Sequence, residues 1–254
     1  MKVLMRQTTL ALLLCIAAAI GNADTITIRA DSWYPINGEP GSEKPGYMIE
    51  MARKILGDAG HSVDYRLMPW ERALAEVRQG NIDCVVGAYI EDAPDFVYPT
   101  ESWGMDESAF YVKKGETWRY TGLDSLASVK LGLIGGYAYD DAFDQYVQSH
   151  PDVVQYVKGD NALENNIKKI MGGRITATVE SPLVMRAKLK DMGLQADIIS
   201  AGNLGEPSDM YIACSPAKPS SKALVELIDA GTQNLRASGE LKDILDNYGL
   251  TDWK

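Results

Sequence analysis

TITIRA, residues 25–30, opens a run of alternating strand and helix patterns that closes with IDCVVGA, residues 82–88. Val63 to Met68, between these two segments, also has the composition of a strand. Apolar residues recur at helical spacing on either side of this middle strand, first at Met48, Met51, Ala52, Ile55 and Leu56 and then at Trp70, Ala73, Leu74 and Val77. The order strand, helix, strand, helix, strand predicts a parallel α/β sheet with ligand-binding loops at the carboxyl ends of its strands.

A second α/β pattern begins at VKLGLI, residues 129–134. Two helical patterns follow, one through Ala142, Phe143 and Tyr146 and one through Leu163, Ile167, Ile170 and Met171, before a predicted strand at 175–179. The extended segments SAFYVK (108–113) and DMYIAC (209–214) lie at the two ends of this unit and could serve as paired crossovers. The tail predicts two further helices, the last with Ser238 as its N-cap.

The first residues have the pattern of an export signal. Lys2 and Arg6 precede an apolar run at 10–20, and Gly21-Asn22-Ala23 supplies the small residues that a signal peptidase reads. We therefore expect residues 1–23 to be a cleaved signal peptide and the mature chain to be periplasmic. The alternative is an uncleaved membrane anchor, but the run is shorter than the roughly 20 residues that span a bilayer.

The composition excludes several classes of protein. The 254 residues are 46% hydrophobic and 24% charged, which is typical of a folded chain. The formal net charge of −10 argues against a nucleic-acid partner, because such a partner needs a basic face.

Two cysteines, Cys84 and Cys214, lie in strand-like runs of the mature chain. They could form a disulfide if their strands are neighbours, or they could be two buried thiols. Their spacing matches no metal site, and His61 and His150 have no Cys or His at ligand spacing. We expect neither a metal nor a cofactor.

Three motifs and their order resemble the bacterial extracellular solute-binding proteins of family 3, which are receptors of polar amino-acid ABC transporters. The motifs are GYMIEM (46–51), GNID (80–83) and LRASGEL (235–241). The resemblance implies a type II periplasmic-binding-protein fold, in which two mainly parallel α/β lobes are joined by two hinge strands and close on a solute. It divides the chain into lobe I, residues 24–110 and 213–254, and lobe II, residues 111–212.

The resemblance also implies a binding site between the lobes. Asp31 and Tyr34 match a polar contact and an aromatic wall, Trp70 matches a second stacking aromatic, and Gly87 and Tyr89 match the segment that holds a ligand carboxylate. In the second lobe Gly136 and Tyr137 match the start of a helix. Glu180 matches the acidic residue that pairs with the ligand's ammonium group.

One departure from the family is the missing arginine that clamps an α-carboxylate. The chain has Glu91-Asp92-Ala93-Pro94-Asp95 where the family has Thr-Pro-Glu-Arg. Acidic side chains near the cleft would repel a carboxylate. We therefore expect a small polar solute, amine-containing or amino-acid-like, that is held by an acidic partner and by cation–π contact.

The sequence is also compatible with other functions. The chain could be a ligand-sensing module of a membrane receptor, or a periplasmic dehydratase that uses Glu180 with Tyr89 or Glu91. We expect no enzyme, because no known catalytic motif is present. The expected partners are a small solute and an ABC transporter permease, and the expected state is a monomer.

Single aromatics such as Trp33 and Trp103 could belong to the core, and Asp140, Asp141 and Asp144 are predicted to be a solvated helix start.

Overall fold

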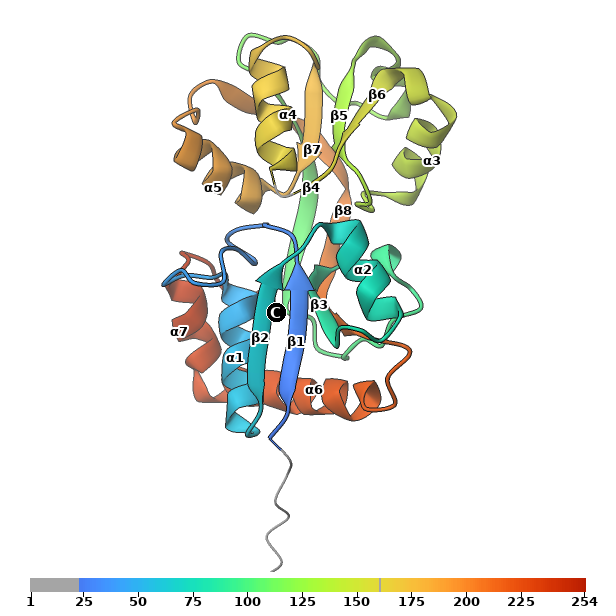
Figure 1. Cartoon of the computed structure of the whole chain (residues 1–254). Coiled ribbons are helices and arrows are strands. Elements are labelled where there is room, and N and C mark those ends of the chain that lie inside the picture. The colour runs from blue at the N-terminus through green and yellow to red at the C-terminus, as the bar shows by residue number, and fades with distance from the viewer. Residues whose placement is uncertain (1–22, 160) are drawn as a thin grey trace, which may run out of the picture.

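The computed structural model describes residues 23–159 and 161–254. These residues form two α/β lobes that are stacked one above the other (Figure 1). An eight-stranded sheet runs through both lobes in the order β2-β1-β3-β8-β4-β7-β5-β6. The predicted two-lobed α/β fold is confirmed. The predicted signal peptide lies outside the described residues, except for Ala23.

Lobe I is built around three strands, β1 (Thr25–Ala30), β2 (Ser62–Leu67) and β3 (Cys84–Ala88). Strand β1 pairs in parallel with both β2 and β3. The helices of this lobe are α1 (Tyr47–Asp58), α2 (Trp70–Arg78), α6 (Ser221–Ser238) and α7 (Glu240–Asp246). The apolar stripe predicted for the first helix is buried in the lobe I core, because α1 packs against the sheet and against α6 and α7.

Lobe II contains the parallel strands β5 (Leu131–Ile134), β6 (Val154–Val157) and β7 (Ala177–Glu180). Its helices are α3 (Asp141–Ser149), α4 (Ala162–Met171) and α5 (Pro182–Met192). Short 3₁₀ helices lie at Ile90–Asp92, Leu123–Ser128 and Pro151–Val153. As predicted, Asp140 begins α3, because its carboxylate accepts hydrogen bonds from the backbone N–H groups of Ala142 and Phe143.

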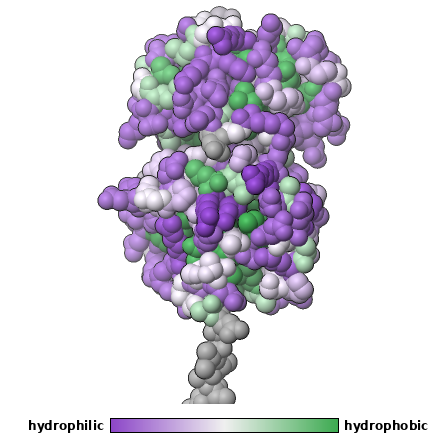
Figure 2. Space-filling model, in the orientation of Figure 1, coloured by the Kyte–Doolittle hydropathy of each residue, from purple (hydrophilic) through white to green (hydrophobic). Residues whose placement is uncertain are grey.

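Two antiparallel strands, β4 (Gly104–Lys113) and β8 (Ile198–Cys214), connect the lobes (Figure 1). The upper part of β4 pairs with β7 in lobe II, and the end of β8 pairs with β3 in lobe I. The lobe limits expected from the sequence, 110/111 and 212/213, therefore fall inside these two strands. A narrow waist separates the lobes in the space-filling view, where most of the visible surface is hydrophilic (Figure 2).

Cys84 and Cys214 face each other across β3 and β8 and form a disulfide. The structure thereby decides between the two alternatives that the sequence left open. Lobe II lies between Cys84 and Cys214 in the sequence. The disulfide therefore links the lobe I strand that precedes lobe II to the strand that returns from it.

The predicted N-cap at Ser238 is wrong. Helix α6 continues through Ser238, and Gly239 separates it from α7. Gly239 has a φ of 86°, a left-handed conformation that glycine adopts without a steric penalty.

Candidate solute-binding site

Trp33 extends from the loop after β1 into the space between the lobes. Its side chain is 7% exposed, and its Nε1 donates a hydrogen bond to Glu180 Oε1 at 2.7 Å. The loop is closed by backbone hydrogen bonds between Trp33 and Asn37, which hold the indole in this direction. Glu180 ends β7, so this hydrogen bond joins lobe I to lobe II.

Tyr137 enters the same space from lobe II. Its hydroxyl donates to Asp31 Oδ2 at 2.6 Å, and its ring lies edge-on to Trp33 with 6.4 Å between the centroids. Gly136, directly before it, has a φ of 88°, and a Cβ there would lie 2.2 Å from Glu71 Cγ of lobe I. A residue without a side chain is therefore required where the lobes meet.

Asp92 forms the lobe I wall of the site. The backbone N–H of Tyr89 donates to its Oδ2 at 2.9 Å, and Trp70 Nε1 donates to its Oδ1 at 3.4 Å. A third donor, the backbone N–H of Ala138, reaches Oδ1 from lobe II at 3.2 Å. Trp70, which the sequence suggested as a stacking aromatic, thus also holds a carboxyl group in place.

Gly87 and Tyr89 lie beside this wall. Gly87 has a φ of 78°, and a Cβ there would lie 2.8 Å from Asn37 Oδ1, so the position favours glycine on two grounds. Tyr89 packs edge-on against Trp33, and its hydroxyl donates to Asp106 Oδ2 at 3.2 Å. Asp106 lies on the hinge strand β4 and also accepts a hydrogen bond from the Ser181 hydroxyl.

Several carboxyl groups of the site have raised pKa values. Burial raises the pKa of Glu180 to about 8, that of Asp92 to about 7 and that of Asp106 to about 6. Hydrogen bonds from Trp33 and Ser181 lower the pKa of Glu180, but burial outweighs them. The interior between the lobes is therefore rich in acidic groups that would ionise more easily beside a cation.

Two small cavities, of about 20 Å³ and about 10 Å³, remain between the lobes. Both are lined by Asp31, Trp33 and Tyr137. Asn37 lines the larger cavity and Glu180 lines the smaller one, and each has a buried oxygen, Asn37 Oδ1 and Glu180 Oε2, that accepts no hydrogen bond from the described residues. Buried acceptors of this kind usually have a donor, which a bound solute or a water molecule could supply.

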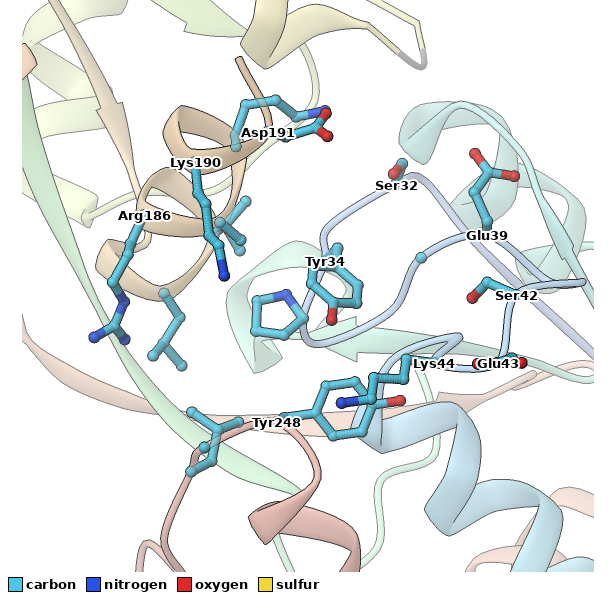
Figure 3. Close-up of a pocket in the computed structure, with 18 residues that line it drawn as sticks. Ser32, Tyr34, Glu39, Ser42, Glu43, Lys44, Arg186, Lys190, Asp191 and Tyr248 are labelled. Carbon is cyan, nitrogen blue, oxygen red and sulfur yellow. The ribbon is translucent and has the colours of Figure 1, made fainter. Parts of the chain in front are cut away.

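Tyr34 is the one predicted site residue that lies apart from the others. It is 39% exposed, stacks at an angle against Tyr248, and lines a separate groove of about 1090 Å³ between α5 and the 32–44 loop. Figure 3 shows the charged side chains of this groove, which include Arg186 and Lys190 of lobe II and Glu39 and Glu43 of lobe I. All four are exposed, so water can satisfy them, unlike the buried acceptors beside Trp33.

The remaining predicted site residues, Asp31, Trp70, Gly87, Tyr89, Gly136, Tyr137 and Glu180, all line or border the space between the lobes. Sequence reasoning missed Trp33, Asn37 and Asp106 as members of the site. The adjacent aromatics Trp33 and Tyr34 gave a signal, but the direction of each depends on the loop conformation.

Other expectations concern residues outside the site. Trp103 is a core residue with no exposed surface, and its Nε1 donates to Thr232 Oγ1. Within residues 23–159 and 161–254, no cluster of His, Cys, Asp and Glu side chains is suited to a metal ion. The helices in these ranges include none that could cross a membrane.

Comparison with known proteins identifies the class of protein that this fold and site represent. The model of the bacterial extracellular solute-binding proteins, family 3, matches residues 26–251, and the chain belongs to this family. A curated relative, the probable amino-acid-binding protein YxeM of Bacillus subtilis (strain 168), is 20% identical over 249 residues, which cover 94% of this chain and 92% of that protein.

Two solved structures are similar over almost their whole length. A histidine kinase sensor domain with similarity to periplasmic binding proteins has a TM-score of 0.73 and 18% identity, covering 90% of this chain and 98% of that one. The substrate-binding protein AbpA of an amino-acid ABC transporter from Streptococcus pneumoniae, bound to L-arginine, has a TM-score of 0.70 and 19% identity, covering 89% and 94%. At these identities the similarity establishes the fold alone.

Proposed function

We propose that this chain is a periplasmic solute-binding protein that captures a small amine-bearing cation between its lobes and delivers it to an ABC transporter. The observation that carries the proposal is Glu180, which is 3% exposed and whose Oε2 accepts no hydrogen bond from the described residues. An ammonium or guanidinium group would supply both the missing donor and a compensating charge. Family membership supports solute binding rather than catalysis.

Capture would proceed by closure of the two lobes about β4 and β8. Asp31 and Trp33 belong to lobe I, whereas Tyr137 and Glu180 belong to lobe II. A solute that touches both pairs binds the closed arrangement more tightly than the open one, and this difference in affinity drives closure. The exposed ion pair between Lys158 Nζ and Glu71 Oε2, 2.7 Å apart, adds a contact at the mouth of the cleft.

A thermal-shift screen of the mature protein against amines, amino acids, sugars and short peptides tests the proposal. We expect amines to raise Tm, because a ligand that binds only the folded state stabilises it. Glu180→Ala and Trp70→Ala should each weaken binding of the strongest amine by about 1–3 kcal/mol in calorimetry. Asp191→Ala, in the groove of Figure 3, is the matched control. Unchanged affinity in both site variants would refute the site.

A second candidate function is ligand sensing, which the similarity to a histidine kinase sensor domain favours. Uptake of the bound amine by cells with and without the gene distinguishes the two. Loss of uptake supports a transporter receptor, whereas unchanged uptake with a lost transcriptional response supports a sensor. We further propose that the protein is a monomer, for which light scattering should give the mass of one chain.

A further inference from the structure

The two unpartnered acceptors of the cleft lie in different cavities. Asn37 Oδ1 belongs to the cavity that Asp92 also lines, and Glu180 Oε2 belongs to the other cavity. Asn37 and Glu180 are 1% and 3% exposed, so bulk water does not satisfy them. The two cavities share Asp31, Trp33 and Tyr137 as walls.

We propose that the solute is a linear cation with N–H donors at both ends and no carboxylate, such as a diamine or a guanidinoalkylamine. One end binds Glu180 and the other binds Asp92 and Asn37, while the Tyr137 side chain gives up its place between them. This inference rests on the proposed function and narrows its substrate class.

The absence of a carboxylate follows from the charges that line the cavities. None of the described residues that line the cavity beside Asn37 is Lys or Arg, and Asp31 and Asp92 would both repel an anion there. Lys158, which lines a wider opening together with Asp92, is paired with Glu71. Lys188 is the one cationic side chain among the described residues that line the Glu180 cavity, where the carboxyl groups of Glu164 and Glu180 outnumber it. An α-carboxylate would therefore meet more acidic groups than cations in either cavity, which disfavours its burial.

The two unpartnered acceptors of the cleft explain why the solute needs an N–H donor at each end. Asn37 Oδ1 and Glu180 Oε2 require N–H or O–H groups, which a quaternary ammonium ion does not have. A single ammonium group could donate to only one of these two acceptors, because they lie in different cavities. A cation with two nitrogen groups would satisfy both and would also replace the Tyr137 hydroxyl as the donor to Asp31.

Binding of this solute requires the Tyr137 side chain to move. The residue follows Gly136, whose positive φ places it at a turn rather than inside a helix or strand. Its hydroxyl donates a hydrogen bond to Asp31, and its ring meets Trp33 edge-on and lies tilted against Tyr139, so displacement breaks this hydrogen bond and both ring contacts. The Trp33 ring would remain as a wall against the alkyl chain of the solute.

Calorimetric titration at pH 8 with agmatine and arginine tests the proposal, because these two probes differ only by the α-carboxylate. We expect agmatine to bind at least about tenfold more tightly than arginine. Butylamine, with one nitrogen, should also bind at least about tenfold more weakly than agmatine. Arginine binding as tightly as agmatine, or butylamine as tightly as agmatine, would overturn the inference.

Variants separate this inference from the proposed function. Asp92→Asn should lower the affinity for agmatine by about tenfold and leave the affinity for butylamine unchanged. Glu180→Gln should lower the affinity for both probes. If arginine and agmatine bind equally and Glu180→Gln weakens both, the cleft is the site but the substrate class is wrong. If no amine binds the wild-type protein, the proposed function fails as well. The wild-type titrations need no variant, so a folding defect in Asp92→Asn leaves the test intact.

Discussion

Trp33 Nε1 and Glu180 Oε1 are 2.7 Å apart and belong to different lobes, although 147 positions separate the two residues in the chain. This hydrogen bond places an indole, rather than the neighbouring phenol of Tyr34, at the centre of the cleft. It also leaves one oxygen of Glu180 available to a solute. Trp33 therefore both lines the cleft with its ring and determines which oxygen of Glu180 a solute can reach.

Trp33→Phe should lower the affinity for amines, because phenylalanine keeps most of the apolar wall and removes the donor to Glu180. We expect a loss of about 1–2 kcal/mol in binding free energy, as for other buried hydrogen bonds to a charged group. Tyr34→Phe is the matched control, since Tyr34 lies in the groove of Figure 3. Calorimetry measures both variants, and a larger effect of Tyr34→Phe would contradict the site.

The free energy of unfolding in the absence of solute should fall as pH rises from about 5 to about 8. Burial raises the pKa of Glu180 to about 8 and that of Asp92 to about 7, so the folded state binds more protons than the unfolded chain in this range. Asp31 and Asp106 also face Glu180 and strengthen the effect by repulsion. Glu180→Gln should flatten the dependence near pH 7. Urea unfolding at several pH values measures it, and an equal slope in wild type and variant would be evidence against a buried, protonated Glu180.

Gly136→Ala should favour an open arrangement of the lobes. Its Cβ would collide with Glu71 of lobe I, 2.2 Å away, and its backbone has a φ of 88°. Gly173→Ala is a matched control, because Gly173 also has a positive φ and a Cβ there meets nothing within 4 Å. Small-angle X-ray scattering should show a larger radius of gyration for Gly136→Ala alone. Equal radii for the two variants would mean that Gly136 does not limit closure.

Replacement of both Cys84 and Cys214 by alanine should lower the free energy of unfolding by about 2–4 kcal/mol, as for other long loops that are closed by a disulfide. Denaturant unfolding measures the change. The wild-type protein in a reducing agent should unfold like the double variant. A wild-type protein whose stability is unaffected by the reductant would argue that the two thiols are not joined.

The arrangement of strands and helices could be predicted from the sequence to a large extent. The strand from 25 to 30 and the apolar stripe from Met48 to Leu56 have clear periodicities, because each has one face buried in the lobe I core. The length of β8 was not predicted, since its middle section contains Gly, Pro and polar residues that interrupt the strand pattern. Pairing with β4 over nearly its whole length holds this section extended.

The site was predicted less completely than the fold. Glu180 and Trp70 could be placed by resemblance, because Glu180 is the last residue of β7 and Trp70 is the first residue of α2. Contacts across the lobes, such as those of Trp33 with Glu180 and of Lys158 with Glu71, depend on how two separate units meet. No local pattern in the sequence encodes that geometry.

The crystal structure of the mature protein grown with agmatine tests the central claim most directly. Our account predicts the guanidinium or ammonium nitrogen within hydrogen-bond distance of Glu180 Oε2, the other end beside Asp92 and Asn37, and the Tyr137 side chain displaced from Asp31. Agmatine bound in the groove of Figure 3, or a cleft in which Tyr137 keeps its hydrogen bond to Asp31, would contradict it.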